Sequence, residues 1–558
     1  MSANTIADHA TKIKSRLFVR ALAFHRDESG VLIIFGLIIF VLMLMIGGMA
    51  VDLMRYESMR VQLQSTSDRA TLAAASLTQA QGSQAVVTDY FAKAGLSEYL
   101  QGVTVVNTVN FRQVSADVET RVPSLFMQMM GVNVLVGPAD STAEEDISEV
   151  EITLVLDISG SMVSGGSQKL NNLKLAASNF VDTVLTGDID HKISITLVPF
   201  NGQVVLGNEL AANYNITTQH TFNTCVDFAP ADFSVSGIST TASLTRSDVI
   251  DPWSSGPYKN RVNPSGTGTE TNYCSEDNRN KVHAYLSDPV ALKAAINGMV
   301  GAGNTSIDIG TKWGLALMDP GSQSVITNMI GAGLVPADFA GRPFAYDSIS
   351  TAKILVVMSD GENTDQHQFN VAYKSGPSPV YRRASDGALA IYHSTVAAPN
   401  QYYVIPTANF YNNYQSTTMG AWQSAVPTGY TNLTWPQLFN YHSVNWVSRA
   451  LYGNALSTNS TTRRNIANIW IGTFRTATIP VTKDTRLDSV CDLAKSPALG
   501  VRVFSIAFEA PVAGQVVLHS CASSDGDYFA VQNAEQAAEI DSAFQMIARQ
   551  ITSLKLTQ

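Results

Sequence analysis

Residues 151–161 have the sequence EITLVLDISGS, in which an apolar run leads into a loop that carries one carboxylate and two hydroxyl groups. The run 151–156 is typical of a parallel strand that is buried on both faces. From Leu170 to Leu185, apolar residues recur at steps of three and four, which predicts an amphipathic helix after the loop. The segment therefore predicts a strand, a loop and a helix of an α/β fold, with Asp157 at the carboxyl end of the strand.

The same pattern returns later in the chain. Further buried strands are predicted at 192–200, 353–358 and 501–508. Helical periodicity over 307–318 predicts a second amphipathic helix. The fold class is therefore α/β, a doubly wound, Rossmann-like sheet whose ligands bind at the carboxyl ends of its strands. The strands are too far apart for simple connections, so we expect large insertions at about 204–281 and 361–468.

Oxygen-bearing side chains lie where these predicted strands end and where the second helix begins. They are Asp157, Ser159 and Ser161 in the first loop, Thr305 before the second helix, and Asp360 after the third strand. Such oxygens are the ligands of a hard cation such as Mg²⁺, and the alternative is a set of helix-capping loops without an ion. The D-x-S-x-S pattern also occurs at 232–236, where it follows no apolar strand, and we interpret that copy as coincidental.

These loops resemble the metal-ion-dependent adhesion site of the von Willebrand factor A (VWA) family. The resemblance extends over about 150–508, apart from the insertions. It implies that the five residues hold one divalent ion, Mg²⁺ or another such as Mn²⁺ or Ca²⁺. It also implies that an acidic residue of a partner protein completes the metal shell.

One uncharged run, residues 31–51, is long enough to cross a bilayer as a helix. Basic residues predominate before it, which favours a cytoplasmic N-terminus and an exported remainder of the chain. A cleavable signal peptide is the alternative, since Gly48-Met49-Ala50 is a small-x-small triplet, but the run is longer than a typical signal sequence. Processing as a type IV prepilin is disfavoured, because Phe35 stands where such sequences carry Glu.

Beyond this run, residues 53–79 lack Pro and Gly and predict a helical stalk. Alternating segments at 103–106 and 115–122 and a short helix ending at Gly131 predict a small α+β region, and the polar stretch 139–149 is expected to be a linker. The predicted domains are a cytoplasmic segment 1–30, a transmembrane helix 31–51, a stalk and α+β region 52–148, and a VWA domain 149–558.

The N-terminal segment resembles the TadE/TadG-like region of Tad (Flp) pilus assembly proteins. The resemblance lies in the sequence before the apolar run, in the Thr71-Leu72-Ala73-Ala74-Ala75-Ser76 ending of the stalk, and in Val122-Pro123-Ser124-Leu125-Phe126. The C-terminal residues also resemble the VWA-bearing TadG kind. The resemblance implies a single-pass protein of the bacterial inner membrane, with most of the chain in the periplasm, whose partners are pilus or pilus-assembly proteins.

Four cysteines suit an oxidising compartment, and the sequence-local pairs Cys225 with Cys274 and Cys491 with Cys521 are favoured among three possible connectivities. Residues 401–450 contain eleven aromatic residues and one charged residue, Arg449. The aromatic residues are expected either to form the core of an insertion or to bind a pilus subunit or polysaccharide.

Composition and motifs exclude several functions. Charged residues make up 15% of the chain and the net charge is −10, which argues against nucleic-acid binding. No P-loop, H-E-x-x-H or G-x-S-x-G motif occurs, so neither nucleotide binding nor these kinds of catalysis is expected. We therefore expect a non-enzymatic pilus assembly or anchoring protein. The alternatives are a minor pilin-like subunit of the filament and, remotely, a metal-dependent hydrolase that uses His367 as a base.

Overall fold

The computed structural model divides the chain into two compact units, Met1–Asp146 and Ile147–Gln558, each described here by itself. The residues it describes are 29–76, 79, 81–107, 111–146, 149–186, 188, 191–252, 274, 279–348, 351–410, 419–532 and 537–553. The predicted cytoplasmic segment therefore lies almost entirely outside the described residues.

The first unit is built on one long helix, α2 (Ser29–Ala75), in which no proline interrupts the backbone ladder. A second helix, α3 (Ser83–Ala94), and an antiparallel sheet pack against its C-terminal half. The strands are β1 (Leu100–Asn107), β2 (Phe111–Pro123), β3 (Val134–Pro138) and β4 (Ser141–Asp146), with β2 pairing with the other three. Within the described residues, α2 contains one stretch long and apolar enough to cross a membrane.

The predicted linker at 139–149 is wrong for its central part. Residues Ser141–Asp146 form β4, which pairs with β2 and places Ala143 opposite Val114 in the core of the unit. The sequence gives no clear strand pattern here, because the other residues of β4 are polar or acidic. An edge strand can pack through a single apolar residue, here Ala143. The short helix expected before Gly131 is a 3-10 turn, Met127–Met130.

The second unit contains a six-stranded sheet of order β19-β18-β10-β5-β6-β9, which confirms the doubly wound α/β class. The strands are β5 (Glu149–Asp157), β6 (Ile193–Phe200), β9 (His283–Leu286), β10 (Thr351–Ser359), β18 (Arg502–Phe508) and β19 (Tyr528–Val531). All neighbouring pairs are parallel except β6 with the edge strand β9.

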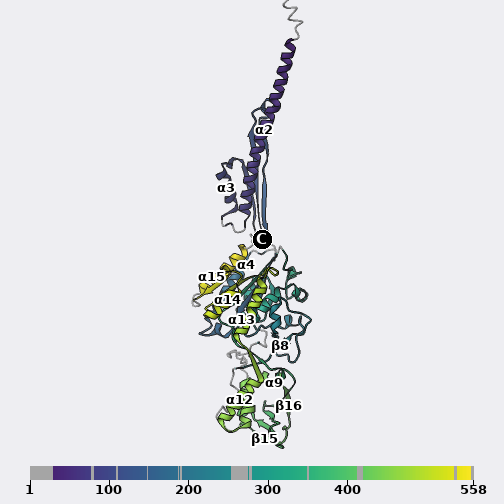
Figure 1. Ribbon diagram of the computed structural model, residues 1–558, viewed down its shortest axis with the longest axis vertical. Helices are drawn as coiled ribbons and strands as arrows, with labels where there is room; N and C mark the ends of the chain where they lie inside the picture. Colours follow the sequence, from purple (N-terminus) through teal and green to yellow (C-terminus); the bar gives the residue numbers. More distant parts are fainter. Residues whose placement is uncertain are drawn as a thin grey trace, which may run out of the picture. The chain divides into compact units, whose positions relative to one another are not determined.

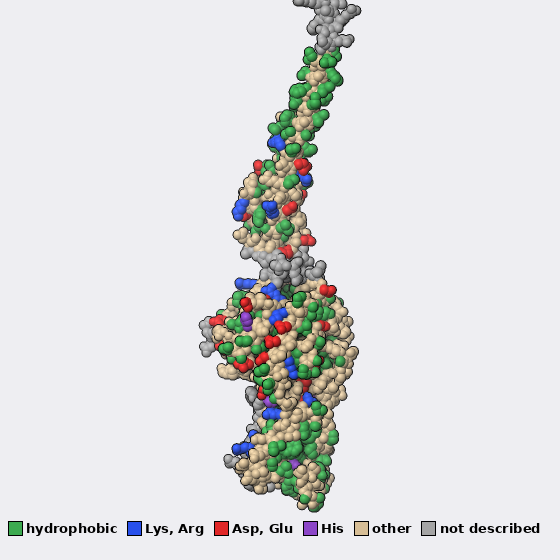
Figure 2. Space-filling model, viewed as in Figure 1, with side chains coloured by type: hydrophobic (Ala, Val, Ile, Leu, Met, Phe, Trp, Pro, Cys, Tyr) green, Lys and Arg blue, Asp and Glu red, His purple; other side chains and the backbone are tan. Residues whose placement is uncertain are grey.

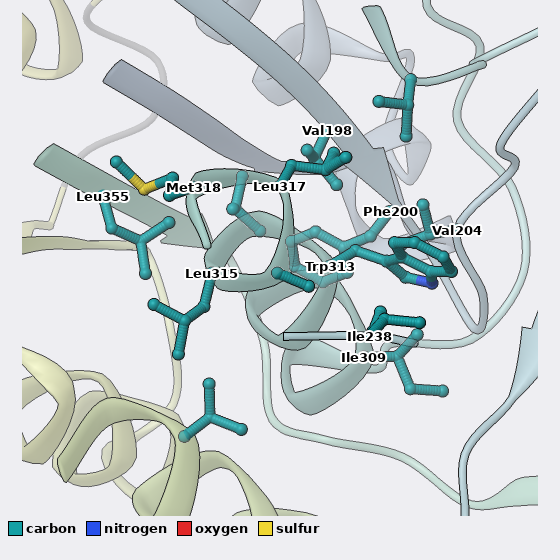
Figure 3. Close-up of a cluster of buried hydrophobic side chains, with 14 of the residues drawn as sticks. Val198, Phe200, Val204, Ile238, Ile309, Trp313, Leu315, Leu317, Met318 and Leu355 are labelled. Carbon is teal, nitrogen blue, oxygen red and sulfur yellow. The ribbon is translucent and has the colours of Figure 1, made fainter. Parts of the chain in front are cut away.

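Helices cover both faces of this sheet. The main ones are α4 (Gln168–Leu185), α6 (Pro289–Gly298), α7 (Ile307–Met318), α8 (Gln323–Gly331), α13 (Pro480–Lys495), α14 (Val512–Cys521) and α15 (Ala537–Ser553). On one face, Trp313 of α7 packs beside Phe200 of β6, and Leu355 of β10 belongs to the same core (Figure 3). Elsewhere α4 and α15 pack against each other, with Phe180 and Phe544 in edge contact (Figure 1).

Two insertions interrupt this core. The first, between β6 and β9, contains α5 (Asn208–Ala211), β7 (Val226–Asp227) and β8 (Thr245–Arg246). The second leaves after β10 through β11 (Gln366–Phe369) and returns through its antiparallel partner β17 (Arg475–Thr478). Both favoured cysteine pairs are disulfide-bonded, Cys225 with Cys274 and Cys491 with Cys521.

The second insertion has a hydrophobic core of its own. Its sheet has the order β15-β14-β13-β12-β16, formed by Ala421–Gln423, Tyr402–Ile405, Leu389–Tyr392, Pro377–Arg383 and Tyr430–Thr434. Its helices include α9 (Trp435–Tyr441), α10 (Val444–Trp446), a π-helix at Val447–Gly453, α11 (Asn454–Leu456) and α12 (Ser460–Phe474). Several of the aromatic residues noted at 401–450, Tyr403, Trp435, Phe439 and Trp446, are buried in this core.

Candidate metal centre

The first loop of the candidate site begins where β5 ends. Asp157 is fully buried, and its carboxylate accepts hydrogen bonds from the Ser159 amide at 2.7 Å and from the Ser359 hydroxyl at 2.5 Å. The hydroxyl oxygens of Ser159 and Ser161 lie 3.0 Å apart. Carboxylate and hydroxyls thus turn toward one region of the loop, as the alternate spacing in the sequence suggests.

The third loop meets the first although the two are far apart in sequence. The Ser161 hydroxyl donates a hydrogen bond to Asp360 Oδ1 at 2.6 Å. This contact follows from the parallel pairing of β5 and β10, which sets Leu156 opposite Met358 and brings the two carboxyl ends together.

The second loop is joined to both of the others. The Gly160 amide donates to the Gly303 carbonyl at 2.9 Å, and the Thr305 amide donates to the Thr364 hydroxyl at 2.9 Å. A Cβ atom built on Gly361 would lie 3.8 Å from the Ser161 hydroxyl oxygen and 3.9 Å from that of Thr305. The two hydroxyls therefore border the same space.

That space is an open cavity of about 620 Å³ at the carboxyl edge of the sheet. Its lining includes Ser161, Thr305 and Asp360, whereas Asp157 and Ser159 are buried and do not line it. The remaining lining residues are Asn304, Gly361, Glu362, Asn363, Thr364, Asp365, His367, Pro480 and Pro511. A ligand that reaches Asp360 from solvent would thus pass acidic and polar groups.

The donor set is suited to a hard divalent cation. Burial, and secondarily the Asp360 carboxylate, raises the pKa of Asp157 to about 7, since two like charges share a poorly solvated region. A cation between them would relieve that repulsion, and hydroxyl oxygens complete an all-oxygen set. Among the described residues, no three His, Cys, Asp or Glu side chains cluster as a metal site, so any ion here depends on the serine and threonine hydroxyls.

Lys169 is a member of this site that the sequence motif does not reveal. Its ammonium group lies 2.9 Å from Asp360 Oδ2 and 3.5 Å from Glu509 Oε2. Glu509 directly follows β18. Because ligands of such sheets bind at the carboxyl ends of the strands, the sequence could have identified Glu509 as a site residue. The lysine offsets the charge of Asp360 and would compete with a cation for that oxygen.

A second lysine, Lys483 at the start of α13, forms hydrogen bonds with the second and third loops of the site. Its fully buried ammonium group donates to the Thr305 carbonyl at 2.6 Å, the Ser306 hydroxyl at 2.7 Å and the Thr364 carbonyl at 2.8 Å. Burial lowers the pKa of Lys483 to about 8, with the Asp308 carboxylate opposing that shift. Because α13 follows β17, this lysine connects the end of the second insertion to the second and third loops of the candidate site.

The other D-x-S-x-S copy does not form such a site. The Asp232 carboxylate accepts from the Ala229 amide, and the Ser236 hydroxyl bonds Asp319, a residue outside the motif. His367 does line the cavity of Asp360. However, burial, together with the nearby Arg475 charge, lowers the pKa of His367 to about 4.

Comparison with known proteins gives one family match and several similar structures. Residues 30–77 match a family model described as putative Flp pilus-assembly TadE/G-like. No curated protein matches the sequence significantly.

Among solved structures, the vWF domain of the type V pili tip protein Mfa5 from Porphyromonas gingivalis is 12% identical, with 73% of this chain and 95% of that chain covered and a TM-score of 0.30. The pilus adhesin RrgA from Streptococcus pneumoniae is 12% identical, with 81% and 48% covered and a TM-score of 0.29. The pilus adhesin SpaC from Lactobacillus rhamnosus GG is 10% identical, with 81% and 33% covered and a TM-score of 0.28.

At these identities and TM-scores, the likeness carries no inference about the site or its ligands. The family match is confined to the N-terminal helix. By sequence, this helical segment is similar to the TadE/G-like family of putative Flp pilus-assembly proteins, and it precedes an α/β unit with a candidate metal centre.

Proposed function

We propose that this protein is a membrane-anchored component of a Tad (Flp) pilus system whose α/β unit captures an acidic group of a pilus or assembly protein through a divalent cation. The observation that carries the proposal is the direct bond between Ser161 and Asp360 beside an open cavity, which unites two metal loops. The TadE/G-like N-terminal match supports the pilus system as its setting.

In this proposal α2 crosses the bacterial inner membrane once. The N-terminus is cytoplasmic and the α/β unit is periplasmic, which agrees with the excess of basic residues before the span. The two disulfides are consistent with an oxidising compartment.

The residues that would hold the ion, Mg²⁺ or a similar divalent cation, are Asp157, Ser159, Ser161, Thr305 and Asp360. When bound, the ion supplies an open coordination position for a partner's carboxylate. The chain's own residues orient that partner: Glu362 and Asp365 line the cavity and repel a carboxylate that is not aimed at the ion.

We propose binding without catalysis. A general base works best when its pKa lies near the operating pH, and His367, with a pKa of about 4, is a weak base at neutral pH. Hydrolysis of a phosphoester that depends on both His367 and Asp360 would favour the hydrolase instead.

Partner capture is expected to require the cation. With a photo-crosslinking residue, p-benzoylphenylalanine, in place of the exposed Glu362, cells supplied with Mg²⁺ should yield an adduct with a pilus-system protein. The adduct should disappear with a membrane-permeant chelator and in an Asp360→Asn background. An adduct of equal yield under chelation would contradict metal-dependent capture.

The second candidate is a minor pilin-like subunit, because the matched segment is a long apolar helix that could pack into a filament. Shearing filaments from cells separates the two roles. Retention of the protein in the inner membrane supports an assembly or anchoring role, whereas its recovery with sheared filaments supports the subunit.

A further inference from the structure

An apolar surface segment of the first unit takes no part in the proposed metal-dependent binding. This segment, residues 124–134, is named here the membrane-proximal loop, and it contains no charged residue. Leu125, Met129 and Met130 are 53%, 70% and 53% exposed. Large apolar side chains that are exposed within one short segment are typical of a surface that contacts another apolar phase.

The loop is fastened to α2 by a buried carboxylate. Asp52 accepts hydrogen bonds from the amides of Leu125, Phe126 and Met127 at 2.9, 2.7 and 2.8 Å. Asp52 is also the first charged residue after the uncharged run 31–51. The backbone of the loop is thereby held at the end of the membrane-spanning segment.

A second contact lies still closer to the membrane. A Cβ atom on Gly48 would overlap the Phe126 ring, so the ring packs directly against the glycine backbone. By contrast, Gly47 has open space at its Cβ position. Close approach of Phe126 therefore requires glycine at position 48.

These contacts determine how deep the membrane-proximal loop would lie in a bilayer crossed by α2. Gly48 lies three residues inside the uncharged run, which at 1.5 Å per residue is about 5 Å from its end. Figure 2 shows how apolar side chains cover α2 along its exposed length. A loop fixed at that depth has hydrocarbon and headgroups as its surroundings, and apolar side chains are stable there.

We propose that the membrane-proximal loop inserts into the boundary of the bilayer that α2 crosses, as a second, interfacial anchor. This inference rests on the membrane anchoring in the proposed function. The occupant of the apolar surface is lipid, because Asp52 and Gly48 hold residues 125–127 at the end of the span, and the exposed Met129 follows two residues later. Two attachments, helix and loop, would fix the rotation of α2 about its axis.

Photo-crosslinking in vesicles tests the proposal. The full chain is reconstituted in phosphatidylethanolamine and phosphatidylglycerol with p-benzoylphenylalanine in place of Met129, Ile46 or Leu72, all exposed apolar positions of the first unit. Ile46 lies in the span, and Leu72 lies 24 residues beyond Gly48 along α2, about 36 Å away. We expect lipid adducts at Met129 and Ile46 and none at Leu72.

The outcomes are distinguishable. A lipid adduct at Ile46 with only a protein adduct, or none, at Met129 would overturn the inference and leave the membrane anchor intact. Absence of lipid adducts at both positions would overturn the anchoring itself. The Gly48→Val substitution should reduce the Met129 lipid adduct by displacing Phe126, and Gly47→Val should not. Equal adduct yields in the two variants would contradict the placement of the loop.

Discussion

Asp157→Asn is expected to abolish divalent-cation binding while making the cation-free protein more stable. The amide can keep its oxygen toward the Ser159 amide and turn its NH₂ group to the Ser359 hydroxyl, so packing is preserved. It removes one of the two ligand carboxylates, and we expect the affinity for Mg²⁺ to fall by more than about 100-fold. Isothermal titration of the purified protein measures this loss.

The expected gain in stability follows from the raised pKa of Asp157. Its carboxyl group has a pKa of about 7 in the folded protein against 3.8 ordinarily, so the folded state binds more protons between these values. Stability of the cation-free protein therefore declines as the pH rises from about 4 to 7, by at most about 4 kcal/mol. Asparagine at position 157 does not ionise, so the variant should not lose stability in this way. Thermal unfolding at pH 8 in chelator should show a higher Tm for the variant than for the unsubstituted protein.

Asp232→Asn is the matched control, because Asp232 occupies the same position in the second D-x-S-x-S copy. It should leave Mg²⁺ binding unchanged. If the Asp157 and Asp232 variants bound Mg²⁺ equally well, the assignment of Asp157 to a metal site would be wrong.

Lys483→Met is expected to destabilise the second unit and to weaken cation binding together. The substitution leaves the Thr305 and Thr364 carbonyls and the Ser306 hydroxyl without their shared donor, and it leaves Asp308 without a buried partner 3.9 Å away. Loss of one member of such a network costs about 3–5 kcal/mol. Chemical denaturation measures the loss, and titration with Mg²⁺ in native buffer measures the affinity.

The control is Lys312→Met, at another fully buried lysine. The Lys312 ammonium group donates to three backbone carbonyls, those of Val235, Ser236 and Gly237, and none of these residues belongs to the three loops of the candidate site. We expect a loss of stability of similar size with unchanged Mg²⁺ affinity. If both variants lost affinity in proportion to stability, Lys483 would have a general structural role and no specific one at the site.

Local patterns predicted the central sheet well. The four apolar runs correspond to β5, β6, β10 and β18, since a parallel strand buried on both faces has a nearly continuous apolar sequence. Because parallel strands end at the same edge of a sheet, the sequence also predicted that Asp157 and Asp360 lie at one edge. There the Ser161 hydroxyl forms a hydrogen bond with Asp360 and joins the two loops. Short, polar or antiparallel strands such as β4 and β9 lack that signal.

The supporting charges could not be predicted in this way. Lys483 lies 178 residues after Thr305, and no spacing rule connects a loop to a helix that follows a long insertion. Lys169 stands in the second position of α4, where a lysine is ordinarily a solvated surface residue. The contacts of Lys483 and Lys169 with the site depend on how the complete sheet assembles. The periodicity of a single segment does not contain that information.

Anomalous X-ray diffraction from crystals of the protein grown with Mn²⁺ would show directly whether the three loops bind a divalent cation. We expect an anomalous peak at the carboxyl edge of the sheet, within bonding distance of the Ser159 and Ser161 hydroxyls and near Asp360, with Lys169 shifted toward Glu509. A map with no peak at this edge at saturating Mn²⁺, with Lys169 still bonded to Asp360, would contradict this expectation.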